Sequence, residues 1–122
     1  MPSPVALTRH YIETHNRQDL DGLLAFVAED VTFKRAGDRP LDGKSAVRRQ
    51  YEQDWSSHKN VVVNIRQVFE AGRNVAVEIH VHSGPPSNVH YDGIVVHHWN
   101  GEDQLTRYQL FVDEVTSAEG CS

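Results

Sequence analysis

The chain has 122 residues and a formal net charge of −5, from 12 Lys+Arg against 17 Asp+Glu. That length fits one domain, and an apolar content of 39% is too high for a disordered chain. No apolar run approaches the ~20 residues of a membrane span, no basic cluster favours nucleic acid, and the lone Cys121 cannot form an internal disulfide. The start, Met1-Pro2-Ser3-Pro4, lacks the pattern of a secretory signal, so we expect a cytoplasmic protein with neither a membrane nor nucleic acid as its partner.

The first half of the chain predicts helices. Residues 4–17 form the first, because Leu7, Tyr11 and His15 recur every four residues. Asp19 can cap a second helix, whose apolar residues form a single stripe: Leu20, Leu23, Leu24, Val27 and Ala28. A short strand over residues 31–35 and a loop over residues 36–40 come next.

A third helix follows Asp42-Gly43 and runs to about residue 56, with Val47, Tyr51 and Trp55 on one face. The apolar period then changes from 3.6 to 2, which predicts strands over residues 61–70, 74–83, 89–99 and 104–115. Short links indicate hairpins. We therefore expect an α+β fold, in which a curved, mainly antiparallel sheet wraps around three N-terminal helices. Residues 1–115 form one domain, and residues 116–122 are expected to be a disordered tail.

The segments 11–24, 30–33 and 41–47, with His98-Trp99-Asn100-Gly101 before the last strand, together resemble the nuclear transport factor 2-like superfamily. The resemblance is to its SnoaL-like and ketosteroid-isomerase-like branches and spans residues 5 to about 115. It implies a cone with an interior pocket, often in a homodimer. This fold hosts isomerases, dehydratases, polyketide cyclases, epoxide hydrolases and non-catalytic binding modules, so it does not by itself specify the chemistry.

The family's functional residues carry over only in part. Ketosteroid isomerases use an Asp base together with a Tyr and a protonated Asp that hold the oxyanion. Tyr11 matches that Tyr, but the base position falls on Arg35 and the second Asp falls near Val95. Steroid isomerisation by that mechanism is therefore not expected, although Asp38 could supply a displaced base. The Arg and two Asp of limonene-type epoxide hydrolases are not reproduced by residues 107–113.

Alternation along the strand 74–83 separates two sets of side chains. Glu78, His80 and His82 share one face, and apolar residues at 77, 79 and 81 share the other. In a functional interpretation the polar set lines the pocket. In a structural interpretation the apolar set faces the helices and the polar set faces water or a partner. A register slip of one residue exchanges the two faces, so both interpretations stay open.

The same alternation does not decide whether His97 faces the pocket. It groups Arg107, Gln109 and Phe111 on one face of the last strand. A neutral His could move a proton, and Tyr11 or Arg107 could stabilise an oxyanion. A zinc site of His80, His82 and His97 is conceivable from its spacing, but the resemblance gives it little support. Since the sequence has no Gly-rich phosphate loop and no Cys pair, we expect neither a cofactor nor a metal.

These observations predict a homodimer that binds a small, largely apolar organic molecule and catalyses cofactor-free isomerisation, dehydration or cyclisation. The alternative is a non-catalytic ligand-binding or assembly module of the same fold. The candidate catalytic residues are Tyr11, His97, His80, Arg107 and Asp38. The candidate substrate-binding residues are Tyr51, Trp55, His82, Gln109, Phe111 and Glu78.

Overall fold

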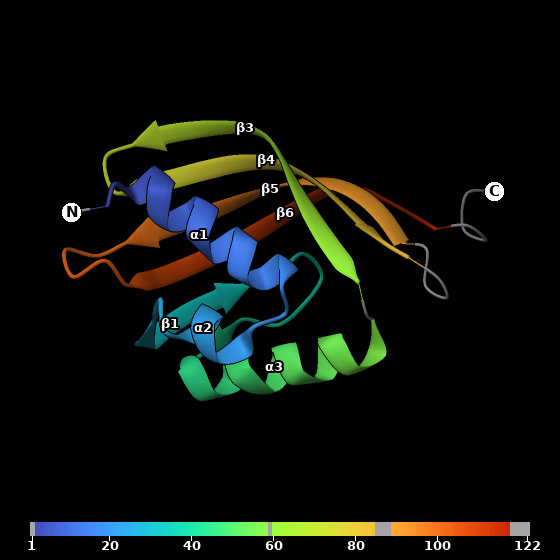
Figure 1. The fold of residues 1–122 in the computed structure, drawn as a ribbon, viewed down its shortest axis with the longest axis horizontal. Helices are drawn as coiled ribbons and strands as arrows, with labels where there is room; N and C mark the ends of the chain where they lie inside the picture. Colours follow the sequence, from blue (N-terminus) through green and yellow to red (C-terminus); the bar gives the residue numbers. More distant parts are fainter. Residues whose placement is uncertain (1, 59, 85–88, 118–122) are drawn as a thin grey trace.

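A curved sheet of six strands, open at both edges, carries the helices on its inner side (Figure 1). The computed structural model describes residues 2–58, 60–84 and 89–117. The helices are α1 (Pro4–Asn16), α2 (Leu20–Leu24) and α3 (Lys44–Ser57). The strands are β1 (Val27–Lys34), β2 (Leu41–Asp42), β3 (Val61–Ala71), β4 (Asn74–Ser83), β5 (Val89–Trp99) and β6 (Leu105–Ser117). The α+β class predicted from the element order is confirmed.

The four long strands pair antiparallel in chain order, as the short links predict. Gly72 in the first of these turns adopts φ 61°, the left-handed conformation that favours glycine. The sheet is completed by β1, which runs parallel to β6 and antiparallel to the two-residue β2. The backbone of β6 continues to Ser117, two residues into the predicted tail, and residues 118–122 lie outside the described part.

The second helix is shorter than its apolar stripe predicts. It ends at Leu24, and Val27 and Ala28 begin β1 instead. Val27 pairs with Leu105 of β6, and the Leu105 N–H donates to the carbonyl of Phe26 at 2.7 Å. A strand pairing between residues nearly eighty positions apart thus overrides a helical pattern that is visible only locally.

The helix α1 lies across the inner side of the long strands, and α3 packs beside β1 (Figure 1). The side chain of Ser3 caps α1 by accepting from the Ala6 N–H at 3.1 Å, and Pro4 occupies the first turn. Tyr11 of α1 and Tyr51 of α3 are both buried, on the faces that the helical spacing predicts. The two helices therefore direct their tyrosines into the same interior space.

Alternation along β4 sends Val75, Val77, Ile79 and Val81 inward, each at most 3% exposed. Glu78, His80 and His82 consequently lie on the outer face. Burial of branched apolar side chains, about 1.5–3 kcal/mol each, explains this orientation. The structural interpretation of this strand is the one that the fold adopts. In the ranges described, no helix is long and apolar enough to cross a membrane.

Candidate functional site

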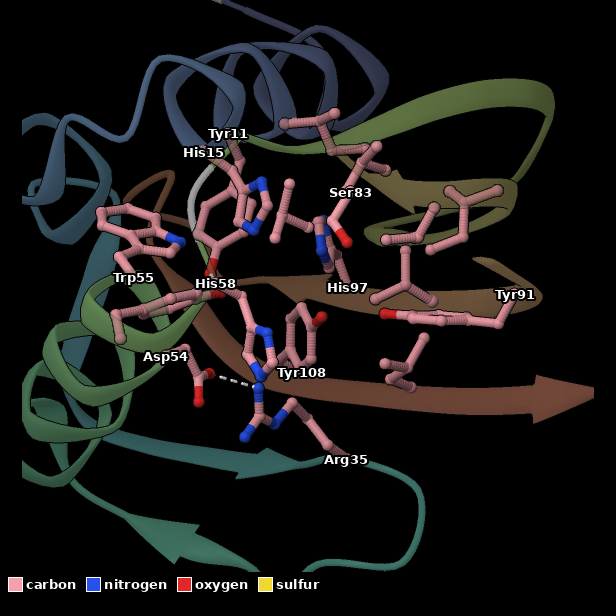
Figure 2. Close-up of a pocket in the computed structure, with 18 residues that line it drawn as sticks. Tyr11, His15, Arg35, Asp54, Trp55, His58, Ser83, Tyr91, His97 and Tyr108 are labelled. Atoms are coloured by element: carbon pink, nitrogen blue, oxygen red, sulfur yellow. Dashed lines mark hydrogen bonds and ion pairs between the residues drawn. The ribbon is translucent and has the colours of Figure 1, made fainter. Parts of the chain in front are cut away.

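A cavity of about 310 Å³ lies between α1, α3 and the inner face of the sheet (Figure 2). Its apolar lining comes mainly from the sheet and α1: Ile12, Val61, Val63, Ile79, Val81, Val95 and Leu110. Its aromatic lining is Tyr11, Tyr51, Trp55, Tyr91 and Tyr108, and its polar lining is His15, Arg35, Asp54, His58, Ser83 and His97. Such a volume, with apolar walls and a few polar groups, suits a compact organic molecule.

Two tyrosine hydroxyls from different helices meet at the cavity wall. The hydroxyl of Tyr11 lies 2.8 Å from that of Tyr51, and both side chains are buried. Burial raises the pKa of both phenols far above the neutral range, so both stay protonated. One hydroxyl donates to the other, and the accepting hydroxyl keeps a proton that it can donate to a ligand.

His97 is fully buried and lies against Tyr11, with ring centroids 5.0 Å apart in an edge-on arrangement. Its Nδ1 lies 3.1 Å from the Thr8 hydroxyl, which accepts from Trp99 Nε1 at 2.9 Å. Because the indole can only donate, the Thr8 hydroxyl has its own proton available, and its remaining partner in the described chain is His97 Nδ1. This arrangement makes Nδ1 an acceptor and places the imidazole proton on Nε2.

The imidazole of His97 is neutral. Burial lowers its pKa to about 3, so it does not take up a proton at physiological pH. Its Nε2 is buried and has no hydrogen-bond partner among the described residues. A buried donor without a partner is rare in folded proteins. His97 is one of the residues that line the cavity.

An ion pair connects the segment just after β1 to α3 beside the cavity. Arg35 donates to Asp54 at 2.5 Å (Figure 2). Its Nε also donates to Asp38 at 3.2 Å. Burial disfavours the charged guanidinium, but the hydrogen bond and charge of Asp54 outweigh it, so the pKa of Arg35 is raised. Arg35 is therefore a permanent cation whose charge is compensated by two carboxylates.

Four of the predicted site residues come together in this cavity. Tyr11 and His97 were candidate catalytic residues, and Tyr51 and Trp55 were candidate substrate-binding residues. They come from α1, β5 and α3, three elements far apart in sequence. Tyr11, Tyr51 and Trp55 follow the helical spacing that predicted them. For His97 the sequence did not decide which face of its strand lies inward.

The other seven predicted site residues lie outside the cavity lining, among them the three on β4 for which the sequence left both faces open. Glu78, His80 and His82 occupy the outer face of β4, because the apolar residues between them fill the interior. Arg107, Gln109 and Phe111 lie on the outer face of β6, where Arg107 donates to Gln109 at 3.2 Å. Asp38 lies in the loop after β1, and its carboxylate pairs with Arg35, which lines the cavity.

The zinc set considered from the sequence does not assemble. His97 faces inward, whereas His80 and His82 face outward on the neighbouring strand, so the three cannot share one ion. The outer imidazoles instead lie near His90, with ring centroids 6.0 to 6.2 Å apart, and His80 bonds to Asp92 at 2.9 Å. Within residues 2–58, 60–84 and 89–117, no group of three or more potential ligands is arranged to hold a metal ion.

Sequence reasoning missed seven polar or aromatic residues of the cavity: His15, Arg35, Asp54, His58, Ser83, Tyr91 and Tyr108. Tyr108 shares its strand face with the buried Leu110, so apolar alternation on β6 could have placed it inside. Arg35 stands where the family resemblance puts a catalytic base. Asp54 and His58 carry no local signal, because their position depends on how the end of α3 meets the sheet.

Together these features define an α+β protein whose open, curved sheet and three helices enclose a central cavity. Residues 8–108 match the family model of the SnoaL-like domain, which covers most of the chain. The protein belongs to the SnoaL-like domain family of the nuclear transport factor 2-like superfamily, as the sequence resemblance implies. No curated protein matches the chain.

Several solved structures share the fold at low sequence identity. SalBIII, an epoxide hydrolase/cyclase-like enzyme with a role in pyran ring formation in the polyether salinomycin, is 16% identical, with a TM-score of 0.84 over 93% of this chain and 95% of that one. A candidate ketosteroid isomerase from Kribbella flavida is 19% identical, with a TM-score of 0.77 over 92% and 78%. An LEH-like epoxide hydrolase from Mycobacterium tuberculosis is 15% identical, with a TM-score of 0.78 over 90% and 82%. At these identities the likeness establishes the fold alone.

Proposed function

We propose that this protein binds a compact, largely apolar molecule that carries a carbonyl group, and that it promotes proton transfer beside that carbonyl without a cofactor. The reaction is then an isomerisation, a dehydration or a cyclisation. The observation that carries the proposal is a set of neutral hydrogen-bond donors at the wall of an otherwise apolar cavity: the Tyr11–Tyr51 hydroxyl pair and Nε2 of His97. The solved relatives include a cyclase-like enzyme and a candidate ketosteroid isomerase, and cyclisation and isomerisation both fall within the proposed class.

Neutral donors suit this chemistry because negative charge develops on a carbonyl oxygen when a neighbouring carbon loses a proton. Donors held in place in a water-poor cavity stabilise that oxyanion more strongly than water does. A neutral imidazole with a low pKa serves this role as an electrophile, since it donates a hydrogen bond without first binding a proton. The pKa of about 3 supports assigning His97 as such a donor rather than as a group that accepts the substrate proton.

A second candidate function is non-catalytic binding of the same kind of molecule. One observation favours it: Asp54, which lines the cavity, is held in an ion pair by Arg35, and so is Asp38 in the adjoining loop. A carboxylate oxygen that accepts from a guanidinium is less available to a ligand. The two functions predict the same ligand but differ in whether the ligand exchanges protons.

Proton exchange into a simple ketone separates the two functions. We expect the protein to bind 2-tetralone in D₂O and to accelerate replacement of its α-hydrogens by deuterium over the rate in buffer, as followed by proton NMR. Tetralin, which has the same shape without the carbonyl, should bind more weakly because it offers no acceptor to the donors.

Each outcome of that experiment decides between the candidates. Binding of 2-tetralone with accelerated exchange supports the enzyme. Binding without acceleration supports the binding module. A protein that binds neither compound, with the amide signals of the cavity strands unshifted, would contradict both.

We also propose that the protein is a homodimer joined through the outer face of the sheet. Among the described residues the large hydrophobic side chains that stay exposed are Phe69, Ile94 and Phe111, at 51%, 43% and 51%. All three lie on this outer face, and Ile94 and Phe111 are directly opposite each other on β5 and β6. A shared apolar face of this kind supports association with a second copy.

Charge placed on that face should separate the subunits. We expect the wild-type protein to have the mass of a dimer by light scattering, and the double substitution Ile94→Asp with Phe111→Asp to give the mass of a monomer. The matched control is Glu52→Arg, a charge change on the exposed side of α3 that should leave the dimer intact. Even a weak dimer should be populated at a protein concentration of about 100 µM. A wild-type protein that is monomeric at that concentration would contradict the proposal.

A further inference from the structure

We propose that His15 is the proton-accepting group of the cavity and that Asn16 is the positioning residue that keeps it in that form. The inference deepens the proposed function and rests on the cavity being a ligand site. It supplies what that function lacks, because the donors already described cannot remove a proton from a ligand.

Asn16 is held in one orientation by the backbone of β3. Its Nδ2 donates to the carbonyl of Val63 at 2.9 Å, and its Oδ1 accepts from the Val63 N–H at 2.8 Å. Exchanging the amide oxygen and nitrogen would set donor against donor and acceptor against acceptor at both bonds. The side chain of Asn16 therefore presents Oδ1, an acceptor, on the side where His15 lies.

This orientation determines the tautomer of His15. Its Nδ1 lies 3.3 Å from Asn16 Oδ1, so Nδ1 must carry the proton and donate. The lone pair of the neutral ring is then on Nε2. His97 has the opposite arrangement, because the Thr8 hydroxyl donates to its Nδ1 and leaves its proton on Nε2.

The two histidines lie at opposite ends of a chain of neighbouring rings. The ring of His15 is edge-on to Tyr51 at 5.9 Å, and the hydroxyl of Tyr51 meets that of Tyr11 at 2.8 Å. Tyr11 in turn is edge-on to His97 at 5.0 Å. All four residues line the cavity, so a ligand bound there has the acceptor at one end of this chain of rings and the donors along the rest of it. Figure 2 shows His15, Tyr11 and His97 around this space.

The imidazole of His15 is also neutral at the pH at which it would accept a proton. Burial lowers its pKa, and this effect outweighs the opposing hydrogen bond to Asn16. The other charged groups that act on it, Asp54 from α3 and Arg35 just after β1, have opposing effects on its pKa. The ring is thus unprotonated at neutral pH and can accept a proton.

The proton transfer balances without another reactant. Nε2 of His15 accepts a proton from the carbon beside the carbonyl, and the electron pair of the broken C–H bond forms the enolate. The enolate oxygen accepts hydrogen bonds from the donors at the other end. The imidazolium then returns the proton to a carbon of the same molecule. The substrate class is therefore a compact carbonyl compound with an acidic C–H, and its phenolic analogues should bind as mimics of the enol.

The tautomers can be measured without any ligand. In ¹⁵N-labelled protein at pH 8, long-range ¹H–¹⁵N spectra should show His15 protonated at Nδ1 and His97 protonated at Nε2. The variant Asn16→Leu removes the acceptor and should give His15 as a mixture of tautomers, whereas Asn16→Asp keeps an acceptor and should retain the Nδ1–H form. A wild-type His15 protonated at Nε2 would overturn the inference.

Exchange of the α-hydrogens of 2-tetralone in D₂O tests whether His15 accepts the proton. We expect His15→Phe to slow the catalysed exchange about 10²–10⁴-fold, because the acceptor is lost, and to leave the affinity for 2-tetralone within about 2-fold, because the carbonyl oxygen contacts the donors. The matched control is His10→Phe on the exposed side of the same helix, which should change neither. Exchange at the wild-type rate in a folded His15→Phe variant would overturn the inference while leaving the proposed function intact. If the wild-type protein does not bind 2-tetralone, the proposed function is contradicted, and the tautomer spectra alone decide whether Asn16 positions His15.

Discussion

Replacing Trp99 with alanine is expected to lower the free energy of unfolding by about 3–5 kcal/mol. Trp99 is fully buried at the end of β5, and its ring packs edge-on against Phe26 at 6.3 Å. Truncation opens a cavity among residues that cannot collapse to fill it, because β5 is paired on both sides. It also removes the Nε1–H that the Thr8 hydroxyl accepts. Urea unfolding followed by circular dichroism measures the change.

The other tryptophan is the matched control. Trp55 is only partly buried and lines the cavity. Trp55→Ala should therefore lower the free energy of unfolding clearly less than Trp99→Ala does. Trp99→Phe keeps the aromatic ring and loses the hydrogen bond, and we expect it to cost about 0.5–1.5 kcal/mol from that bond, with a further packing loss. Equal losses in Trp55→Ala and Trp99→Ala would show that the interior is not packed as described.

Replacing His97 with phenylalanine should reduce catalysed α-hydrogen exchange about 10²–10³-fold, the loss seen when one oxyanion donor is removed. The substitution keeps the shape of the ring and its contacts with Tyr11 and Tyr108. It removes the Nε2 donor and the acceptor of the Thr8 hydroxyl. The decrease should appear in the rate at saturating 2-tetralone, because the interaction is strongest with the enolate.

The adjacent residue gives a matched control. His98 faces the opposite side of β5 and contacts Asn74 at 2.7 Å, so His98→Phe should leave exchange unchanged. A His97→Phe variant that folds and exchanges 2-tetralone at the wild-type rate would rule out His97 as a donor to the oxyanion. Equal losses in both variants would point to a general disturbance of β5.

The His97→Phe variant should also differ from the wild-type protein in how its stability depends on pH. The pKa of His97 is about 3 in the folded protein, well below the ordinary value of 6.5, so between these values the unfolded chain binds a proton that the folded chain does not. Stability contributed by this group is complete above pH 6.5 and falls as pH decreases, by up to about 1.4 kcal/mol per unit. His97→Phe should lack that part of the slope, and His98→Phe should retain it. Parallel slopes in the two variants would show that His97 is not buried as a neutral ring.

Much of the fold follows from patterns that are local in the sequence. The helical spacing of Leu7 and Tyr11, and of Val47 and Tyr51, defines one buried face on each helix, and the change to a period of 2 after residue 60 marks the long strands. Val27 shows where such patterns fail, because it fits a helical stripe as well as a strand. Its pairing with Leu105 is a distant contact that no local period contains.

The residues of the candidate site also divide into those that local patterns predict and those that only the packed structure places. Tyr11, Tyr51 and Trp55 could be predicted because a helix that packs on a sheet has one inner face, and apolar spacing marks it. On β4 the alternation separated Glu78, His80 and His82 from their apolar neighbours but did not say which set faces inward. Only the packed structure shows that the valines and Ile79 fill the interior, which places these three polar residues outside.

The sequence by itself determined the fold class, the order of its elements and the helix faces, since each depends on the period of neighbouring side chains. The tertiary structure decided which imidazoles reach the cavity and which nitrogen of each carries the proton. His97 is neutral because α1 and the sheet bury it, and His15 is held as an acceptor because Asn16 bonds to the backbone of β3. Burial and hydrogen bonding between distant segments set both properties, and a single strand or helix contains neither.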